Sequence, residues 1–178
     1  MELSTATRLI QGAIRTKGPQ NWADLGAGSG LFSLALGEIL PVGSSVFAVD
    51  KDQNALDGIS WKYKDKNLVR IHGDVEEELS LPQLDGVLLA NVMHYIVRQE
   101  DFFKRLGGRL TENGILIIIE YDTTRSNPWV PYPISLDAMK KMAAKVGYDI
   151  RLLGTVPSRF NSGKLYSVAL HPTRNPGR

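Results

Sequence analysis

Three glycines stand at alternate positions in the stretch "DLGAGSG", directly after a short apolar run. Glycine lets the backbone turn tightly and approach a ligand without a Cβ in the way. Asp50 closes the next apolar run, 20 residues after Gly30. A carboxylate at that place can accept hydrogen bonds from both hydroxyls of a ribose. The pattern therefore predicts a site for a nucleoside-like cofactor.

The spacing of the glycines distinguishes a dinucleotide ligand from a nucleoside-like ligand with cationic groups. The dinucleotide fingerprint is G-x-G-x-x-G/A, whereas here Gly30 comes one residue early and Leu31 occupies the sixth position. Asp24 precedes the first glycine by two residues, and a carboxylate there suits a ligand with cationic groups better than a pyrophosphate. The spacing disfavours NAD, so an NAD-dependent oxidoreductase is the least favoured alternative.

The elements that must position these residues alternate along the chain. The sequence predicts strands at 21–25, 44–50, 67–74, 84–91 and 114–122, and helices at 3–14, 31–40, 52–66, 98–106 and 135–147. The fourth and fifth strands are apolar at nearly every position, as expected for strands covered on both faces of a parallel sheet. Two more runs, 148–155 and 164–170, are close enough to form an antiparallel hairpin. The expected fold is α/β, a three-layer αβα sandwich around a doubly wound sheet.

Length and composition exclude several classes of function. The 178 residues fit one domain, expected over residues 1–171 and followed by a flexible tail over 172–178. The chain has no cysteine, which excludes disulfides, thiolate nucleophiles and cysteine-based zinc sites. Because its three histidines are scattered, no metal site is expected.

Charge and hydropathy limit the expected partners and location. The formal net charge is +2, and no clustered basic face favours nucleic acid as a partner. The basic stretch "WKYKDK" is expected at a helix end, where lysines suit the helix dipole. The N-terminal stretch lacks the apolar region of a signal peptide, and no apolar run approaches the length of a membrane span. We therefore expect no membrane contact and a cytoplasmic location.

Five motifs, taken in order, are similar to those of a known family. "DLGAGSG", "VFAVDKD", "HGDVEEE", "LDGVLLANVMHY" and "LGGRLTENGILIIIEYD" resemble the successive motifs of class I S-adenosylmethionine-dependent methyltransferases, over residues 20–122. The resemblance implies a seven-stranded, mostly parallel sheet of order 3-2-1-4-5-7-6 with an antiparallel last strand. It also implies S-adenosyl-L-methionine as cofactor and S-adenosyl-L-homocysteine as product.

The same resemblance implies roles for the residues of the glycine loop. Asp24 would orient the methionine end of the cofactor, and Gly26, Ala27 and Gly28 would line it. Gly30 is expected to serve the packing of the following helix against the strand instead of contacting the ligand.

Five further residues receive roles from the resemblance. Asp50 would bind the ribose, with Lys51 under the edge of the adenine. Asp74 would accept a hydrogen bond from the adenine amino group beside the Val75 amide. Asn91, which ends the fourth strand, would face the methionine part and the incoming substrate.

The residues that carry the methyl transfer are sought at the same edge of the sheet. His94 and Tyr95 are the first candidates, since a histidine can deprotonate a hydroxyl near neutral pH; alternatively, both pack around the cofactor. Arg159, at the turn between the last two strands, would anchor a carboxylate or phosphate of the substrate. The proline-rich loop over 123–133, with Trp129, is expected to form a pocket wall.

The favoured function is methyl transfer from the sulfonium to an oxygen or nitrogen nucleophile of a small metabolite. Two alternatives remain open: a methyltransferase that acts on a macromolecule, RNA or protein, and a non-catalytic, methyltransferase-like binding subunit. The chain has few residues before its first strand and no long insertion. The acceptor pocket is therefore formed by the proline-rich loop and the Arg159 turn, or the acceptor is large, or a second subunit, in a homodimer or as a partner, completes it.

Overall fold

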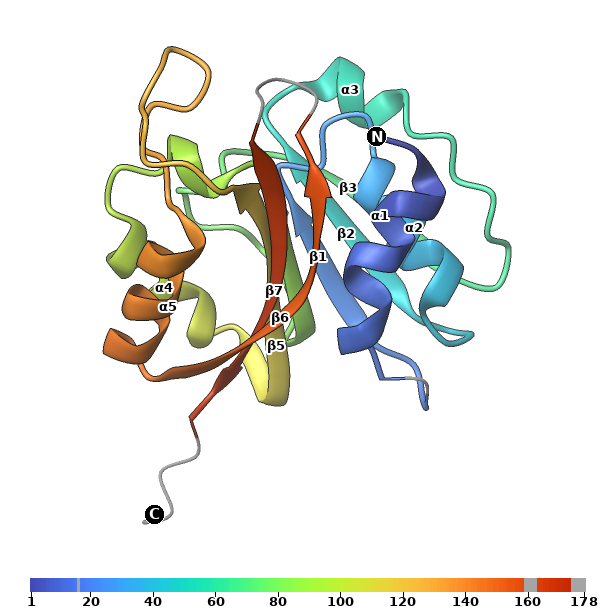
Figure 1. Cartoon of the computed structure of the whole chain (residues 1–178). Coiled ribbons are helices and arrows are strands. Elements are labelled where there is room, and N and C mark those ends of the chain that lie inside the picture. Colours follow the sequence, from blue (N-terminus) through green and yellow to red (C-terminus); the bar gives the residue numbers. More distant parts are fainter. Residues whose placement is uncertain (16, 159–162, 174–178) are drawn as a thin grey trace.

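A single seven-stranded sheet organises the chain in the computed structural model, which describes residues 1–15, 17–158 and 163–173 (Figure 1). The strand order is β3-β2-β1-β4-β5-β7-β6. The first five strands pair in parallel, and β7 runs antiparallel to both β5 and β6. The predicted order and the antiparallel last strand are confirmed. The strands are β1 (Asn21–Leu25), β2 (Ser45–Asp50), β3 (Asn67–His72), β4 (Leu84–Ala90), β5 (Leu110–Tyr121), β6 (Tyr148–Pro157) and β7 (Lys164–Pro172).

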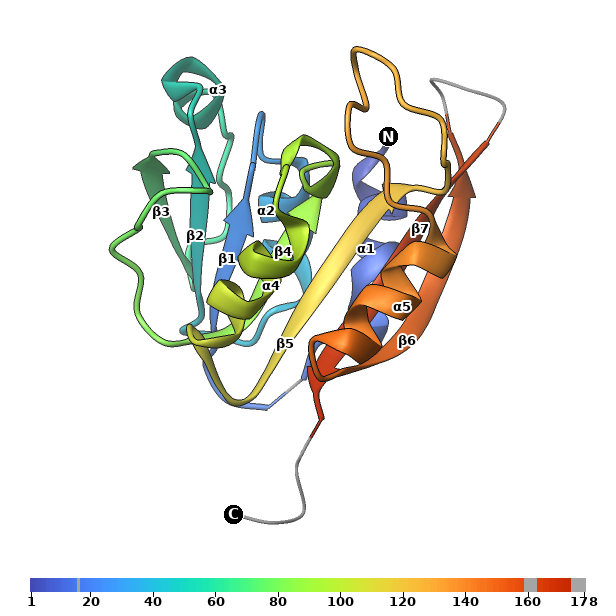
Figure 2. The ribbon, with the colours of Figure 1, turned by 90° about the vertical axis from the view of Figure 1, so that its left-hand side faces the viewer.

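Helices cover both faces of this sheet, so the predicted three-layer αβα sandwich is also confirmed. Figure 2 shows α1 and α2 on one face and α4 and α5 on the other. The last helix begins where its cap predicts, since the Ser135 hydroxyl accepts a hydrogen bond from the Ala138 amide at 3.3 Å. The helices are α1 (Leu3–Ile10), α2 (Leu31–Ile39), α3 (Gln53–Asp57), α4 (Gln99–Gly107) and α5 (Leu136–Lys145), with short 3-10 helices η1 (Gln11–Ala13) and η2 (Met93–Tyr95).

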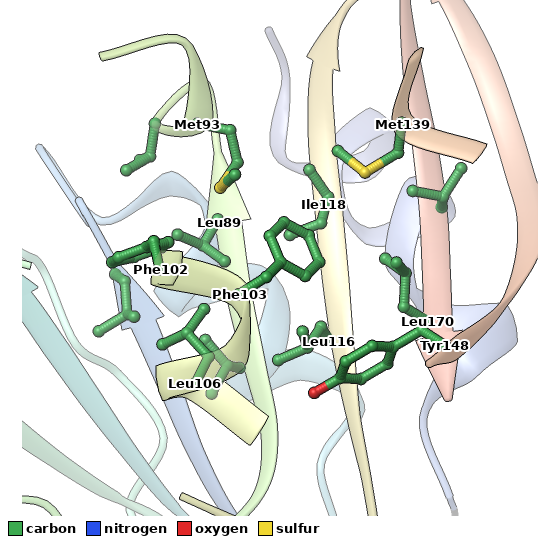
Figure 3. Packing of buried hydrophobic residues seen from close by; sticks show 14 of the residues in the cluster. Leu89, Met93, Phe102, Phe103, Leu106, Leu116, Ile118, Met139, Tyr148 and Leu170 are labelled. Atoms are coloured by element: carbon green, nitrogen blue, oxygen red, sulfur yellow. The ribbon is translucent and has the colours of Figure 1, made fainter. Parts of the chain in front are cut away.

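The core lies in two layers, one on each face of the central strands. Leu89 and Ile118 pack with side chains of α4 and α5 (Figure 3), whereas their neighbours Leu88 and Ile117 pack with side chains of α1 and α2. All four side chains are fully buried. Successive residues of a strand point to opposite faces, which explains why β4 and β5 are apolar at nearly every position.

The helix predicted over 52–66 is wrong beyond Asp57, where α3 ends. The chain continues as an irregular segment in which Trp61 and Tyr63 pack against α2 at Gly37. A Cβ on Gly37 would collide with both rings, so the absence of a side chain at this position leaves room for them. Burial of two aromatic rings outweighs the helical preference of "WKYKDK". The lysines of that stretch therefore do not lie at a helix end.

Smaller differences concern the first helix and the chain end. The helix predicted over 3–14 is α-helical to Ile10 and then continues as η1. β7 includes Pro172, and the Thr173 amide donates to the Gly147 carbonyl oxygen at 2.8 Å. Residues 174–178 of the predicted tail, like Arg159, lie outside the described residues. In the part of the chain that the structure describes, no helix has the length and hydropathy needed to cross a membrane.

Candidate active site

The glycine loop after β1 is tied to the end of β2. The amides of Gly26 and Ala27 both donate to the Val49 carbonyl oxygen, at 2.8 and 2.9 Å. The Gly28 amide donates to Asp50 Oδ2 at 2.7 Å. Gly28 has a φ of 51°, and a Cβ at this position would meet no heavy atom within 4 Å. The loop therefore offers bare backbone beside a carboxylate.

The other two glycines of the loop serve close packing. At Gly26, with a φ of 75°, a Cβ would collide with a methyl group of Val92. At Gly30, with a φ of 81°, a Cβ would lie 2.6 Å from the Ile59 side chain. Gly30 therefore serves packing, but against Ile59 in the segment after α3 and not between the helix and the strand as expected. The absence of a side chain at both positions lets the loop lie close to its neighbours.

Asp24 lies beneath the loop with only 1% of its surface exposed. Its Oδ2 accepts a hydrogen bond from the Ser33 hydroxyl at 2.6 Å. Burial raises the pKa of Asp24 to about 6; the Ser33 hydrogen bonds oppose this shift, and the negative charge of Asp50 adds to it. Among the described residues no cation pairs with this carboxylate, which makes it complementary to a cationic ligand group. Ser33 was not predicted as a site residue, because a serine inside an apolar helix carries no distinctive signal.

A cavity of about 500 Å³ opens at the ends of β2, β3 and β4, and we name it the β2 cavity. Six of the residues predicted to bind the cofactor line it: Gly26, Asp50, Lys51, Asp74, Val75 and Asn91. Lys51 Nζ lies 3.6 Å from Asp74 Oδ2. Asp24, Ala27 and Gly28 are not among its lining residues. Tyr95 lines it, as do four residues that the sequence did not single out: Gly73, Glu76, Val92 and Ile96.

A second cavity, of about 590 Å³, lies between α1, the start of α2, the end of β6 and the start of β7, and we name it the α1 cavity. Its wall includes Arg8 from α1, Phe32 from α2 and Tyr121 from the end of β5. No residue of α1 was predicted to belong to the site. α1 is held at this edge by packing against α2 and β6, and by the Ser167 hydroxyl of β7, which donates to the Leu9 carbonyl oxygen at 2.7 Å.

Asn91 lines both cavities. It has a φ of 58°, which is uncommon for a residue other than glycine, and its amide donates to the Ile119 carbonyl oxygen at 2.8 Å. Its side-chain oxygen, Oδ1, is buried with no hydrogen-bond partner among the described residues. Buried polar atoms are rarely left unpaired, and Asn91 is the residue that the two linings have in common, so it is a candidate for contact with a ligand.

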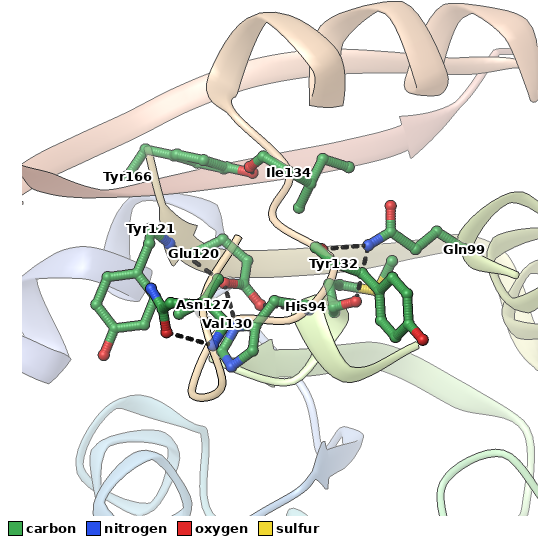
Figure 4. Close-up of polar contacts among 10 residues, drawn as sticks. His94, Gln99, Glu120, Tyr121, Asn127, Val130, Tyr132, Ile134 and Tyr166 are labelled. Carbon is green, nitrogen blue, oxygen red and sulfur yellow. Dashed lines mark hydrogen bonds and ion pairs between the residues drawn. The ribbon is translucent and has the colours of Figure 1, made fainter. Parts of the chain in front are cut away.

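His94 and Glu120 form a buried polar pair beside this junction (Figure 4). His94 Nδ1 lies 2.8 Å from Glu120 Oε2, and the exposed fractions of the two side chains are 2% and 1%. The His94 amide donates to Glu120 Oε1 at 3.2 Å, and the Tyr121 amide donates to Oε2 at 3.2 Å. Glu120 thereby joins the loop after β4 to the end of β5.

The His94 ring lines neither cavity. It lies between the rings of Tyr95 and Tyr121, with centroid distances of 4.3 and 5.8 Å, and those two tyrosines line the β2 and α1 cavities respectively. The pair His94–Glu120 therefore supports the wall between the cavities. Glu120 was not predicted, although a single charged residue at the end of the apolar run "GILIIIEY" was a usable signal.

The proline-rich loop does not enclose either cavity. Trp129 is 80% exposed and lines neither of them. The Tyr132 amide donates to the His94 carbonyl oxygen at 2.9 Å, so the loop instead supports the segment that carries His94. Within residues 1–15, 17–158 and 163–173, no group of three or more side chains has an arrangement that could hold a metal ion.

Comparison with known proteins identifies the class to which this fold and site belong. The family described as "Methyltransferase domain" matches residues 23–118, and the chain belongs to that family. It is a class I S-adenosylmethionine-dependent methyltransferase, as the resemblance of its motifs implied. Among curated protein sequences no significant match was found.

Solved structures share the fold at low sequence identity. The YcgJ protein from Bacillus subtilis has a TM-score of 0.73 at 10% identity, over 97% of this chain and 100% of that one. A Burkholderia thailandensis 1,6-didemethyltoxoflavin-N1-methyltransferase has a TM-score of 0.77 at 15% identity, over 97% and 78%. The magnesium protoporphyrin IX methyltransferase of Synechocystis PCC 6803 has a TM-score of 0.69 at 15% identity, over 96% and 77%.

The residues present fit the cofactor S-adenosylmethionine. The carboxylate of Asp50 suits a ribose. The open backbone at Gly28 and the buried carboxylate of Asp24 suit the amino-acid end of the cofactor with its ammonium group. The unpaired oxygen of Asn91 provides an acceptor for a further donor. These are the features that a sulfonium nucleoside with an amino-acid end requires.

Proposed function

We propose that this protein transfers the methyl group of S-adenosylmethionine to an oxygen or nitrogen nucleophile of a small molecule bound in the α1 cavity. The observation that carries the proposal is Asn91, which lines both the β2 cavity and the α1 cavity and whose Oδ1 is buried without a partner among the described residues. Cofactor and acceptor must lie next to each other for direct methyl transfer, and this residue lines both compartments.

In the β2 cavity, the chain's own residues would hold the cofactor by its polar ends. Asp50 would accept from the ribose hydroxyls, and Asp74 from the adenine amino group beside Val75. Lys51 would cover the adenine edge, and its ion pair with Asp74 is exposed enough to rearrange. When bound, the cofactor supplies a methyl group that its sulfonium already activates, so that the protein mainly has to align the nucleophile.

In the glycine loop, Asp24 would orient the ammonium group of the methionine end through the loop above it. Gly26, Ala27 and Gly28 would present their backbone to that end. The anchoring of this loop on Val49 and Asp50 supports the assignment, because it keeps the backbone in place before the ligand binds.

His94 and Tyr95 would have positioning roles instead of taking part in the chemical step. The buried His94 ring is held by Glu120 and lines neither cavity, which favours a role in fixing the junction over direct proton removal. Tyr95 lines the β2 cavity and is half exposed, so it would close over the cofactor. Both assignments are proposals, as is the substrate-anchoring role of Arg159.

A small acceptor is favoured over a macromolecule by the size of the α1 cavity. Its volume of about 590 Å³ lies within the range of about 300–1,000 Å³ that is usual for small-molecule sites. The Burkholderia structure contains 1,6-didemethyltoxoflavin together with S-adenosylhomocysteine, which supports the same choice by analogy. A cytoplasmic location and a homodimer or partner subunit stay predictions.

The cofactor assignment is tested by calorimetry with S-adenosylhomocysteine on the Asp50→Asn variant. We expect affinity at least tenfold lower than in the wild type, because one charged hydrogen bond contributes about 1.5–3 kcal/mol. Asp57→Asn is the matched control, since Asp57 is an exposed carboxylate that bonds to Gln53 away from the cavity. Unchanged affinity in Asp50→Asn would refute the assignment.

The acceptor class is tested by methyl transfer from radiolabelled S-adenosylmethionine. Cell extract is separated into small molecules, RNA and protein, and each fraction is incubated with the enzyme. Label in the small-molecule fraction is the expected result, whereas label in RNA or protein would favour the macromolecular alternative. No label in any fraction, with the cofactor bound, would favour the non-catalytic alternative.

A further inference from the structure

The helix α1 presents two different faces. Ala6, Leu9 and Ile10 are buried in the core. Three polar residues at intervals of three, Glu2, Thr5 and Arg8, line the α1 cavity instead. Residues three apart on a helix lie on the same side, so this second stripe belongs to the cavity wall.

Two cations belong to this wall among the described residues, the amino terminus of Met1 and the guanidinium of Arg8, and the charge of Arg8 is available. Its Nη2 donates to the Thr5 hydroxyl at 3.3 Å, which holds the guanidinium along the helix. No carboxylate of the described residues lies within ion-pair distance of it, whereas Arg15 pairs with Asp85 at 2.6 Å. A guanidinium keeps its charge at all physiological pH values and matches a carboxylate or phosphate with two parallel hydrogen bonds.

The rest of the wall is mainly apolar. Leu31 and Phe32 contribute from α2, Val156 from the end of β6 and Leu165 from the start of β7. Apolar walls suit the aromatic or aliphatic body of a ligand. The wall therefore fits a molecule with one apolar body and one charged end.

We propose that the methyl acceptor is such a molecule, an apolar or aromatic acid whose anionic group binds Arg8. The proposal rests on the proposed function, since it takes the α1 cavity as the acceptor site. Glu2, the N-cap of α1, lies next to Met1 in the chain, so its carboxylate offsets the charge of the amino terminus at that end of the wall. Arg8 is left as the cation whose charge is not offset, and the Thr5 hydroxyl holds its guanidinium. The anionic group is therefore directed to the Arg8 end.

The test uses three probes of one shape: benzoate, benzamide and benzylamine, which are anionic, neutral and cationic. Each is titrated against the protein loaded with S-adenosylhomocysteine, and binding is followed by saturation-transfer NMR. We expect wild-type protein to bind benzoate about tenfold more tightly than benzamide, the factor that corresponds to one charged hydrogen bond.

The variants assign this preference to one side chain. Arg8→Gln is expected to bind benzoate about tenfold more weakly and benzamide as before, and Arg8→Glu is expected to prefer benzylamine. Both should fold, because Arg8 is exposed. Arg98→Gln, at the exposed start of α4 and outside both cavities, is the matched control and should keep the wild-type preference.

Two kinds of failure can be told apart. If the protein binds S-adenosylhomocysteine but shows no preference for benzoate, prefers benzylamine, or keeps its benzoate preference in Arg8→Gln, the anion site is refuted and the methyltransferase proposal stands. If wild-type protein does not bind S-adenosylhomocysteine, the proposed cofactor site fails, and the acceptor site fails with it.

Discussion

At the scale of single residues, the site keeps charged and polar groups in positions that are unfavourable without a ligand. Asp24 is buried beside a hydroxyl rather than a cation, and burial raises its pKa to about 6. The Oδ1 of Asn91 is buried without a partner in the described structure. Groups of this kind lower the stability of the free protein and are retained where they serve binding.

Replacement of Asp24 by asparagine should raise the stability of the protein and weaken its binding of the cofactor product. Because the pKa in the folded protein lies above the ordinary value of 3.8, the folded state binds more protons than the unfolded state between pH 4 and 6. The free energy of unfolding therefore falls as the pH rises through this window and stays lower above it. The asparagine side chain carries no charge, so Asp24→Asn should raise the free energy of unfolding at pH 7 by on the order of 2–3 kcal/mol, at about 1.4 kcal/mol per pKa unit.

Urea denaturation at pH 7 and at pH 4 measures this effect, and calorimetry with S-adenosylhomocysteine measures its consequence for binding. The difference from wild type should become small at pH 4, where Asp24 is protonated in the folded protein. The affinity for S-adenosylhomocysteine at pH 7 should fall, because the ammonium group loses its counter-charge. A variant that is less stable than wild type at pH 7 would contradict this account of Asp24.

At the scale of elements, the junction of β1, the glycine loop and α2 sets the shape of the site. The loop is held by hydrogen bonds to Val49 and Asp50, and Gly30, the N-cap that precedes α2, has a left-handed backbone conformation. Gly28 and Gly30 share this backbone conformation, but only Gly30 is pressed against a neighbouring side chain. The two glycines therefore differ in function.

Alanine substitutions should reveal that difference. Gly30→Ala combines backbone strain with overlap onto Ile59, so we expect a loss of about 2–4 kcal/mol in the free energy of unfolding. Gly28→Ala adds the strain alone, about 1 kcal/mol, but should weaken S-adenosylhomocysteine binding by adding a Cβ to the open face. Gly18→Ala is the control, with a φ of 74° and no neighbour within 4 Å. Equal stability of the Gly28 and Gly30 variants would contradict the packing role of Gly30.

At the scale of the whole molecule, the α1 and β2 cavities share Asn91 at one edge of the sheet. The side chains of the core are buried on both faces, so we expect a ligand to add contacts at this edge. A ligand that binds only the folded state stabilises it by mass action.

S-adenosylhomocysteine at 100 times its dissociation constant should stabilise the protein by about 2.7 kcal/mol. For a chain of this length the melting temperature should rise by roughly 5–10 °C, as measured by thermal denaturation. NADH at the same concentration should leave it unchanged, because the glycine spacing does not match a dinucleotide site. A rise with NADH and none with S-adenosylhomocysteine would revive the oxidoreductase alternative.

The patterns that are local in the chain predicted much of this protein. The glycine spacing, the carboxylate at the end of β2 and the apolar runs of β4 and β5 lie within short stretches, and five motifs in order carried the resemblance that implied the sheet order. The local pattern predicted a helix over 58–66 that the structure does not have. There, the side chains of Trp61 and Tyr63 pack against α2 at Gly37. Helical preference is weak compared with that burial.

Only the tertiary structure determined which residues of different elements are neighbours in the site. The α1 cavity joins Arg8, Tyr121 and Leu165, and the supporting pair joins His94 to Glu120. Residue spacing predicts neither the cavity lining nor the pair, because the residues come from different elements and become neighbours only when the sheet is assembled. The kind of cofactor could therefore be inferred from "DLGAGSG" and its acidic companions, whereas the acceptor site, formed by residues more than a hundred positions apart, required the fold.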